Sequence, residues 1–351
     1  MIIKKVRLTN FRSYKKKVFD FSEKGLLVLG ANTAGKTNFI EAVYFACSGK
    51  SFRAGKDVEV IGWEEKVARV EVKVVVDGVE EVVEVAIYGE GVKGRKRGGK
   101  RFMINGVGKK QADFVGFFTG VLFWPEDLEM VIGSPGTRRR YLNRVLSLVD
   151  RDYRVSLGAY ERGLRQRNRL LSKIREGEGD RRQLFYWDKL VIKNGGVITE
   201  KREKFIEFLN ENIDIFYDLD IYYDKSVISV GRLKKYEGAE VGAGVTLVGP
   251  HRDDFVVKVK KGGQLRELAC YGSRGEQRLG VLAIKLCEVE YLAKVKGERP
   301  VLFLDDIFSE LDREHRKLVM EKVFDQQTVV TATEIDDLPK ELLEKLEVIK
   351  L

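Results

Sequence analysis

A loop of glycine and other small residues ends in a lysine and a threonine, a combination that can hold phosphates. Gly30–Thr37 reads GANTAGKT and matches the spacing GxxxxGK[ST]. The apolar run GLLVL precedes it and TNFIEAVYFACS follows, so a buried strand should enter the loop and a helix should leave it. In that context backbone N–H groups surround the phosphates, Lys36 neutralises the β and γ oxygens, and the Thr37 hydroxyl holds Mg²⁺. The alternative is a glycine-rich turn without a ligand. The predicted ATP-binding residues here are Gly30, Ala31, Asn32, Thr33, Ala34, Gly35, Lys36, Thr37 and Asn38.

Two adjacent carboxylates end a second apolar run. The letters VLFL at 301–304 predict a buried strand, and Asp305 and Asp306 follow it directly. We interpret Asp305 as the acid linked to Mg²⁺, and Asp306 as the group that orients or deprotonates the attacking water. The predicted catalytic residues are therefore Lys36, Asp305 and Asp306, and the predicted metal ligands are Thr37 and Asp305. An aspartate at this point can instead cap a helix.

A serine and a glycine at the start of another helix form a second candidate phosphate-binding element. The sequence YGSRGEQ at 271–277 opens the helical segment RLGVLAIKLCEVEYLAKV. One γ-phosphate scarcely needs two such elements, so we predict that Ser273, Gly275 and Gln277 reach the ATP of a second subunit. The alternative is a plain helix cap, because Ser273 and Glu276 have the spacing of a capping box. A cap and a phosphate clamp can coexist.

The two halves of this site are separated by most of the chain, which predicts an insertion within one ATPase fold. Residues 67–104 alternate as an antiparallel ribbon around the turn Asp77-Gly78. Two helical segments at 150–176 and 181–217 predict a helical hairpin, with a break of the second arm at Gly195-Gly196. The predicted fold class is α/β: a composite ATPase head from 1–135 and 225–351, an antiparallel β subregion, and a helical insertion at 136–224.

The net charge of +10 favours a polyanionic partner. Every charged residue from 91 to 110 is basic, and a solvated loop without a ligand is the alternative interpretation. A second candidate surface combines the triplet Arg138-Arg139-Arg140 with the row Arg162, Arg165 and Arg169. The row lies on one helix face. It could equally form ion pairs with acids on the other arm of the hairpin. The predicted DNA-binding residues are Lys93, Arg95, Lys96, Arg97, Lys100, Arg101, Arg138, Arg139 and Arg140.

Other sites find little support in the composition. Three scattered cysteines and two histidines predict neither a disulfide framework nor a zinc site. His251 is interpreted as a structural residue, with phosphate sensing as the alternative. No long apolar stretch and no signal-peptide pattern is found, so we expect a cytoplasmic protein without a membrane partner.

Several segments together resemble the RecF family of DNA-repair ATPases, relatives of the SMC and ABC-type ATPases, over essentially the whole chain. They are LTNFRSY (8–14), the phosphate loop with TNFIEA, SGKSFR (48–53), FWPEDLEMVIGSPGTRRRYL (123–142), GPHRDD (249–254), SRGEQ (273–277) and FLDDIFSELD (303–312). The resemblance implies an ABC-type head and assigns Gly35, Lys36 and Thr37 to the nucleotide loop. It also assigns Ser273, Gly275 and Gln277 to the signature motif, and Asp305 and Asp306 to the acidic pair. In one departure, Thr33 stands where similar proteins usually carry glycine, and its β-branch restricts the backbone.

The resemblance further implies what the protein does. It implies ATP-driven homodimerisation on single- or double-stranded DNA, slow hydrolysis that resets the dimer, and partnership with RecR and RecO in helping RecA to load at gaps. It also implies roles in replication-fork maintenance and in the SOS response to DNA damage. Two alternatives share the same motifs: an ATPase subunit of a membrane transporter, against which the basic loop and arginine-rich hairpin argue, and a DNA clamp with negligible turnover.

Overall fold

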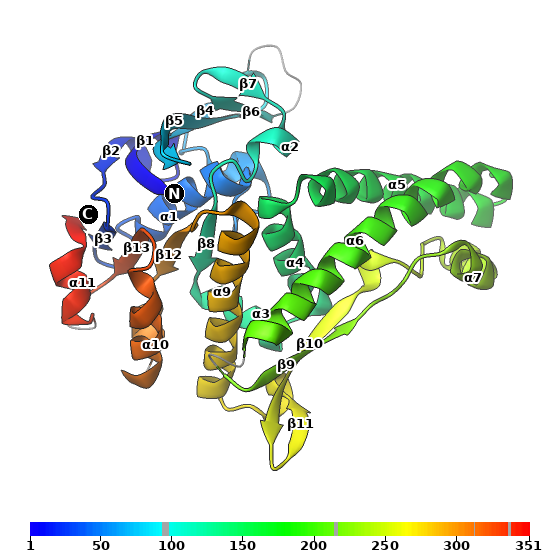
Figure 1. Cartoon of the computed structure of the whole chain (residues 1–351). Helices are drawn as coiled ribbons and strands as arrows, with labels where there is room; N and C mark the ends of the chain where they lie inside the picture. The colour runs from blue at the N-terminus through cyan, green and yellow to red at the C-terminus, as the bar shows by residue number, and fades with distance from the viewer. Residues whose placement is uncertain (93–97, 214–216, 312, 336–337) are drawn as a thin grey trace. The chain divides into compact units, whose positions relative to one another are not determined.

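The computed structural model describes residues 1–92, 98–213, 217–311, 313–335 and 338–351. The chain forms two compact units, one of Met1–Asp127 with Lys285–Leu351 and one of Leu128–Ile284. The boundaries fall at η3 (Pro125–Leu128) and within α9 (Arg274–Lys296). Figure 1 colours the chain from blue to red, and both ends belong to the first unit.

A parallel five-stranded sheet forms the centre of the first unit. Its strand order is β14-β3-β13-β12-β8, so strands from the N-terminal and C-terminal parts of the chain are combined in one sheet. Every residue of the four strands other than β14 is buried, which explains why the sequence reads as short apolar runs without alternation. The strands are β3 (Gly25–Leu29), β8 (Gly120–Phe123), β12 (Val301–Asp305), β13 (Thr328–Ala332) and β14 (Glu347–Lys350). The predicted head built from both terminal segments is confirmed.

An antiparallel sheet of the order β2-β1-β4-β5-β6-β7 completes the first unit. Its strands are β1 (Ile2–Phe11), β2 (Tyr14–Asp20), β4 (Val67–Val76), β5 (Val79–Tyr88), β6 (Gly99–Ile104) and β7 (Val107–Lys109). The hairpin turn between β4 and β5 has positive φ at Asp77 (50°) and Gly78 (76°), and Asn105 and Gly106 repeat this pattern. These are the mirror-image turns that suit the twist of a hairpin, so the predicted ribbon is confirmed.

Helix α1 (Lys36–Ser48) contacts strands of both sheets, including β12 and β13 of one and β1 and β4 of the other. It is apolar on nearly every side, as a helix between two layers must be. Its first residues are thereby held at the edge where the parallel strands end. The remaining elements of this unit are η1 (Asp57–Val60), α2 (Gln111–Phe114), η7 (Ile307–Glu310), α10 (Arg313–Val323) and α11 (Lys340–Lys345).

The second unit contains a long helical hairpin and a small sheet. Helices α5 (Arg151–Arg175) and α6 (Leu184–Asn212) lie side by side, and Figure 1 shows them as an extended pair. A three-stranded antiparallel sheet has the order β11-β10-β9. The other elements are α3 (Glu129–Ile132), α4 (Pro135–Val149), η4 (Arg181–Gln183), β9 (Leu219–Asp224), α7 (Val230–Ala243), η6 (Pro250–Arg252), β10 (Asp254–Lys261), β11 (Gln264–Glu267) and α8 (Leu268–Tyr271).

The hairpin was predicted correctly in outline and wrongly in one detail. α5 ends at Arg175, and Gly177 takes a positive φ of 79° in the turn. The expected break at Gly195-Gly196 is wrong, because α6 continues through both glycines. A Cβ on Gly195 would lie 2.6 Å from Cγ2 of Ile228 and 3.2 Å from the Tyr160 ring. This glycine therefore permits close packing within a continuous helix.

The two units do not coincide with the predicted segments. Residues 225–284 belong to the second unit, although we grouped them with the head. Strand β9 pairs with β10 from Leu219↔Val259 to Asp224↔Asp254, which ties this segment to the chain that follows the hairpin. The functional grouping of residues 225–284 with the head remains a prediction. Within the described residues, every helix is too short or too polar to serve as a membrane span.

Candidate functional site

The phosphate loop lies between β3 and α1, the context that its sequence pattern requires. Gly35 caps α1 with a φ of 106°, a conformation that favours glycine. The Tyr14 hydroxyl donates to the Gly35 carbonyl at 3.1 Å, and the Gly30 amide donates to the Ala332 carbonyl at 3.3 Å. The loop is thus fixed at both ends, with the positive end of the α1 dipole facing it.

Lys36 is held inside the loop by several partners. Its Nζ donates to the carbonyls of Gly30 at 2.9 Å and Ala31 at 3.4 Å, and to Oγ1 of Thr333 at 3.3 Å. It also pairs with the Asp306 carboxylate at 3.6 Å. The ammonium group is therefore positioned by groups that phosphate oxygens can replace, and it is almost fully buried.

Thr37 at the start of α1 and Asp305 at the end of β12, the two predicted metal ligands, lie in contact. The Thr37 hydroxyl donates to Oδ1 of Asp305 at 3.2 Å, and the Thr331 hydroxyl donates to the same oxygen at 2.7 Å. Burial raises the pKa of Asp305, the two hydroxyls lower it, and the neighbouring Asp306 charge raises it again. A buried carboxylate with this balance gains from a nearby cation.

Asp306 occupies an unusual backbone conformation at the end of β12. Its φ of 52° is left-handed, and its amide donates to Oγ1 of Thr331 at 3.0 Å. Thr331 therefore contacts both acids. The Asp306 side chain remains partly exposed beside Lys36.

The residues present fit a magnesium ion that is bound mainly through phosphate. Across the described part of the chain, no group of three His, Cys, Asp or Glu side chains could hold a metal by itself. A hydroxyl and one carboxylate are the donor set that Mg²⁺ uses when a nucleotide supplies the other oxygens. Thr37 and Asp305 would provide these two oxygens, and the ion would neutralise charge on the phosphates.

Thr33 is strained in the loop. Its φ is 74°, a region in which a β-branched side chain is a rare outlier. The departure from glycine noted in the sequence thus falls on a position whose geometry suits glycine.

Replacing Thr33 by glycine is expected to raise the free energy of unfolding by about 1 kcal/mol, because the strain relieved exceeds the added entropy of the unfolded chain. Urea denaturation without nucleotide measures it. Asn32→Gly is the matched control, since Asn32 has no positive φ and should only lose stability. Equal effects of the two changes would show that Thr33 stores no strain.

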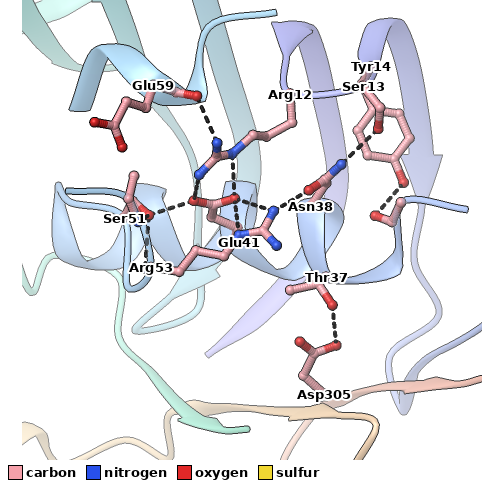
Figure 2. Close-up of polar contacts among 12 residues, drawn as sticks. Arg12, Ser13, Tyr14, Thr37, Asn38, Glu41, Ser51, Arg53, Glu59 and Asp305 are labelled. Atoms are coloured by element: carbon pink, nitrogen blue, oxygen red, sulfur yellow. Dashed lines mark hydrogen bonds and ion pairs between the residues drawn. The ribbon is translucent and has the colours of Figure 1, made fainter. Parts of the chain in front are cut away.

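A buried carboxylate on α1 joins three of the segments that carry the family resemblance (Figure 2). Glu41 is fully buried and accepts two hydrogen bonds from Arg12, at 2.8 and 2.7 Å. It also accepts from Ser51 at 2.5 Å and from Arg53 at 2.9 Å. Arg53 in turn contacts the Asn38 side chain, which donates to Ser13 at 2.8 Å.

This Glu41 cluster supports the first turn of α1, where Thr37 and Asn38 lie. Burial would raise the pKa of Glu41, but the hydrogen bonds from Arg12, Ser51 and Arg53 outweigh it, so the pKa lies below its ordinary value. Sequence reasoning did not single out these residues. The signal was present, since LTNFRSY, TNFIEA and SGKSFR each contribute one charged member.

Replacing Glu41 by glutamine is expected to lower the free energy of unfolding by about 3 kcal/mol, because two arginines lose their buried counter-charge. The folded-state pKa is depressed, so the stabilisation is present above the ordinary value of 4.5 and is lost as the pH falls through the lower value. Urea denaturation at pH 7 and at acid pH measures both effects, with the exposed Glu65→Gln as control. A difference that grows on acidification would contradict this account.

The signature segment forms a complete capping box at the start of α9, within the second unit. The Ser273 amide donates to Oε2 of Glu276 at 2.6 Å, and the Glu276 amide donates to the Ser273 hydroxyl at 3.3 Å. Hydrogen bonds to Lys261 and to Ser273 lower the pKa of Glu276 to about 2. Gln277 Nε2 donates to the carbonyls of Ala269 at 3.0 Å and Gly272 at 3.3 Å. The capping box is therefore formed in the structure, and the role of this segment at the ATP of a second subunit remains a prediction.

The basic loop is only partly described. Lys93, Arg95, Lys96 and Arg97 lie outside the described residues. Lys100 pairs with Asp57 at 2.6 Å and donates to the Gly49 carbonyl at 2.6 Å, and its burial lowers its pKa. That side chain is thus committed to packing within the protein. Arg101 is exposed on the other face of β6, where a DNA contact remains open to it.

The arginine triplet Arg138–Arg140 also contains both side chains with structural partners and an exposed one. Arg138 binds the Asp254 carboxylate through two hydrogen bonds at 2.6 and 2.8 Å. Arg139 donates to the Asp253 carbonyl at 2.8 Å. Both side chains fasten α4 to the start of β10, so a structural role accounts for them. Arg140 is exposed and bonds only Thr137 at 2.9 Å within the described chain.

The GPHRDD segment holds a buried polar network. Arg202 pairs with Asp253 at 2.8 Å, and both side chains are almost completely buried. Nδ1 of His251 lies 2.7 Å from the Tyr160 hydroxyl, and Nε2 lies 3.0 Å from the Thr246 carbonyl. Burial lowers the pKa of His251 to about 4, so the ring is neutral near pH 7. Both ring nitrogens have partners, which favours the structural interpretation of this residue.

Comparison with known proteins agrees with this geometry. The model of the RecF/RecN/SMC N terminal domain family matches residues 2–340. The chain is 32% identical to the DNA replication and repair protein RecF of Lachnoclostridium phytofermentans, covering 96% of this chain and 94% of the relative. It is 34% identical to the RecF protein of Clostridium acetobutylicum, covering 100% and 98%.

Solved structures show the same likeness. A structure of the recombination mediator protein RecF-ATPrS in the RecFOR pathway has a TM-score of 0.87 and 30% identity, covering 99% of this chain and 95% of that one. A RecF-ATP structure of the same pathway has a TM-score of 0.86 and 32% identity, covering 96% and 93%. An SMC head domain has a TM-score of 0.53 at 17% identity, covering 100% and 94%, which concerns the fold alone. The chain therefore belongs to the RecF family of DNA replication and repair proteins, with the ABC-type ATPase head that this family shares with SMC proteins.

Proposed function

We propose that the protein is an ATP-dependent DNA-binding protein of recombinational repair and replication-fork maintenance in the cytoplasm. The observation that carries the proposal is the meeting of Lys36 and Thr37 with Asp305 and Asp306 where three adjacent parallel strands end. The structures of RecF with ATP and its analogue support a nucleotide in this place.

The residues divide the work of ATP hydrolysis. When ATP binds, Lys36 exchanges its carbonyl partners for the β and γ oxygens. The phosphate charge then replaces the Asp306 carboxylate as the counter-charge of the ammonium group, which releases Asp306. Asp306 then orients or deprotonates a water that attacks the γ-phosphorus, while the bond from that phosphorus to the β–γ bridging oxygen breaks and ADP and phosphate leave. Asp305, aligned by Thr37 and Thr331, would hold Mg²⁺ together with Thr37, and the ion would supply positive charge to neutralise the phosphates. Catalysis by positioning alone is consistent with a weak, DNA-stimulated ATPase.

Dimerisation completes the site. Ser273, Gly275 and Gln277 act on the ATP of a second copy, so ATP holds two chains together and hydrolysis releases them. The capping box supports this role by holding the start of α9, which carries Ser273 and Gly275, in a defined turn. The protein works with RecR and RecO in helping RecA to load at gapped DNA, and the RecFOR pathway named for the related structures supports this part of the proposal.

Replacing Ser273 by arginine is expected to leave ATP affinity unchanged and to abolish ATP-dependent dimers, because the bulky cation blocks the signature surface. Light scattering with and without ATP measures dimers, and calorimetry measures ATP affinity. Ser273→Ala is the comparison variant: it removes the hydroxyl proposed to reach the second copy's ATP without adding bulk, so it should weaken the dimers less than Ser273→Arg. Loss of ATP binding in Ser273→Arg would mean that the signature acts within its own subunit.

DNA binding with and without ATP, across a salt series and with gapped, single-stranded and duplex substrates, tests the function itself. ATP-dependent binding and ATP turnover that rises with DNA support a repair ATPase. Binding without turnover would favour a clamp that uses ATP only for assembly. If the rate of ATP hydrolysis did not change with DNA and required a membrane partner, a transporter subunit would be favoured and the proposal would be overturned.

A further inference from the structure

The helical hairpin carries an open hollow of about 520 Å³ between its two arms. Ala159, Gly163 and Gln166 of α5 line it at spacings of four and three, so they share one helix face. Tyr186, Trp187 and Leu190 line it from the start of α6. The hollow lies wholly within the second unit, and the proposed ATPase and dimer functions do not use it.

Small residues on α5 create this hollow. A Cβ on Gly163 would lie 2.4 Å from Cδ2 of Leu190 and 3.2 Å from Cγ1 of Val191. The glycine therefore lets α6 approach closely at the floor, and Ala159 leaves space one turn earlier. The larger side chains of α6, those of Tyr186, Trp187 and Leu190, line the sides of the hollow.

Arginines with free guanidinium groups border the hollow. Arg162 and Arg165 line it, and Arg169 continues the row one turn further. Among the residues that the structure describes, no hydrogen bond or ion pair engages these three guanidinium groups. Arg167 on the same helix differs sharply, since it is buried and pairs with Asp188 and Glu240, both at 2.7 Å. The outward row is therefore free to bind an external anion.

Aromatic rings stand beside these charges. Tyr186 is 63% exposed, although tyrosine usually buries its ring, and Trp187 packs edge-on against it with centroids 4.9 Å apart. The two rings lie at 81° to each other, and Tyr186 is the more exposed of the two. Exposed rings next to unpaired cations are the arrangement with which proteins hold unpaired bases and their phosphates.

We propose that this hollow binds single-stranded nucleic acid, with an unpaired base on Tyr186 and Trp187 and its flanking phosphates on Arg162 and Arg165. The inference rests on the proposed DNA-binding function and adds to it a strand-selective site on the hairpin. Bases within a duplex are already stacked and cannot reach the rings, so the site distinguishes single from double strands. A protein partner is disfavoured because it would need several acids to match the free arginine row.

Affinity for a fluorescent oligo-dT and for a duplex of equal length, measured by anisotropy, tests the site. Tyr186→Ala is expected to weaken oligo-dT binding about tenfold. The double change Arg162→Gln with Arg165→Gln should reduce the salt slope for oligo-dT by about 1.4. Phe185→Ala and Arg182→Gln are matched controls, because these exposed residues do not line the hollow and should leave both affinities unchanged. Circular dichroism verifies that each variant retains its helices.

Tryptophan fluorescence adds a direct readout. The chain has three tryptophans, so Trp63→Phe with Trp124→Phe leaves Trp187 as the sole reporter. Quenching by oligo-dT, and none by duplex, supports the site. Unchanged oligo-dT affinity in the lining variants, or equal losses for duplex, would overturn the inference while leaving ATP-dependent DNA binding intact. Wild-type protein that binds duplex but no oligo-dT would do the same, and binding of neither would overturn both proposals.

Discussion

Replacing Asp306 by asparagine is expected to slow ATP hydrolysis by about a hundredfold to ten-thousandfold while ATP stays bound. The carboxylate is the group that orients or deprotonates the attacking water, and an amide cannot accept that proton. Asparagine tolerates the left-handed φ of 52° at this position, so the backbone should keep its course. The amide hydrogen bond to Thr331 is unaffected, because the main chain makes it.

The same substitution should strengthen ATP binding and trap dimers. Asp306 pairs with Lys36 at 3.6 Å, so its charge competes with the γ-phosphate for the ammonium group. Removing that charge favours the nucleotide and keeps the two subunits together. The measurements are phosphate release under single turnover, and light scattering with ATP and after dilution.

Two controls separate these effects. Asp325→Asn removes a partly exposed carboxylate of the same unit and should change neither quantity. Asp305→Asn should reduce hydrolysis and also weaken Mg²⁺-dependent binding, since this residue contacts Thr37 directly. Unchanged turnover in Asp306→Asn would identify another residue as the group that activates water. Loss of ATP binding there would give Asp306 a structural role only.

Much of the nucleotide site was predictable because its parts are local. A fully buried strand reads as an apolar run, and the loop after β3 needs glycine where φ is positive, as at Gly35. The acids at the end of β12 are also evident, since few buried strands end in two charges. Only the sheet order remained unknown: β13 lies between β3 and β12 and supplies Thr331 to both acids.

The Glu41 cluster was not predictable by the same reasoning. It depends on the packing of α1 against the turn after β1 and on a loop after the helix. Each segment contributes one charged residue to the cluster, Arg12, Glu41 or Arg53, and the partners of that residue lie elsewhere in the chain. A buried glutamate on an otherwise apolar helix was the available signal, because such a carboxylate needs cationic partners.

Basic residues show the limit of charge patterns. A cluster of like charges in the sequence predicts the sign of the local electrostatic potential, but it does not predict where each side chain points. Lys100 turns inward to Asp57, and Arg138 is held by Asp254, whereas Arg162 and Arg165 of the hairpin have no hydrogen bond or ion pair to any residue that the structure describes. The acids that capture the first two are distant in sequence. Their pairing was set by strand and helix packing that the sequence pattern does not specify.

Replacing Lys36 by alanine is expected to weaken ATP binding by on the order of a hundredfold and to abolish ATP-dependent dimers. The ammonium group is the buried cation of the loop, and it contacts Gly30, Ala31 and Thr333 at the place where phosphate oxygens should bind. Bound ligand stabilises the native state in proportion to its affinity. At an ATP concentration 100 times the wild-type Kd, the gain should fall from about 2.7 to about 0.4 kcal/mol.

Thermal unfolding with and without ATP measures this gain directly. The variant without ATP serves as its own control, because any collapse of the loop appears as lost stability in both conditions. Lys36→Arg keeps the charge but changes its shape, so partial ATP stabilisation is expected from it. A full gain in Lys36→Ala would exclude the lysine from nucleotide binding.

The double variant of Lys36→Ala with Asp306→Asn resolves the remaining ambiguity. Removing the lysine alone leaves the Asp306 carboxylate without its cation and facing the incoming phosphates. If part of the lost affinity is this uncompensated repulsion, the double variant should bind ATP better than Lys36→Ala, and the two changes will not be additive. Strict additivity would mean that the lysine acts on phosphate alone and that its pairing with Asp306 has no bearing on the nucleotide.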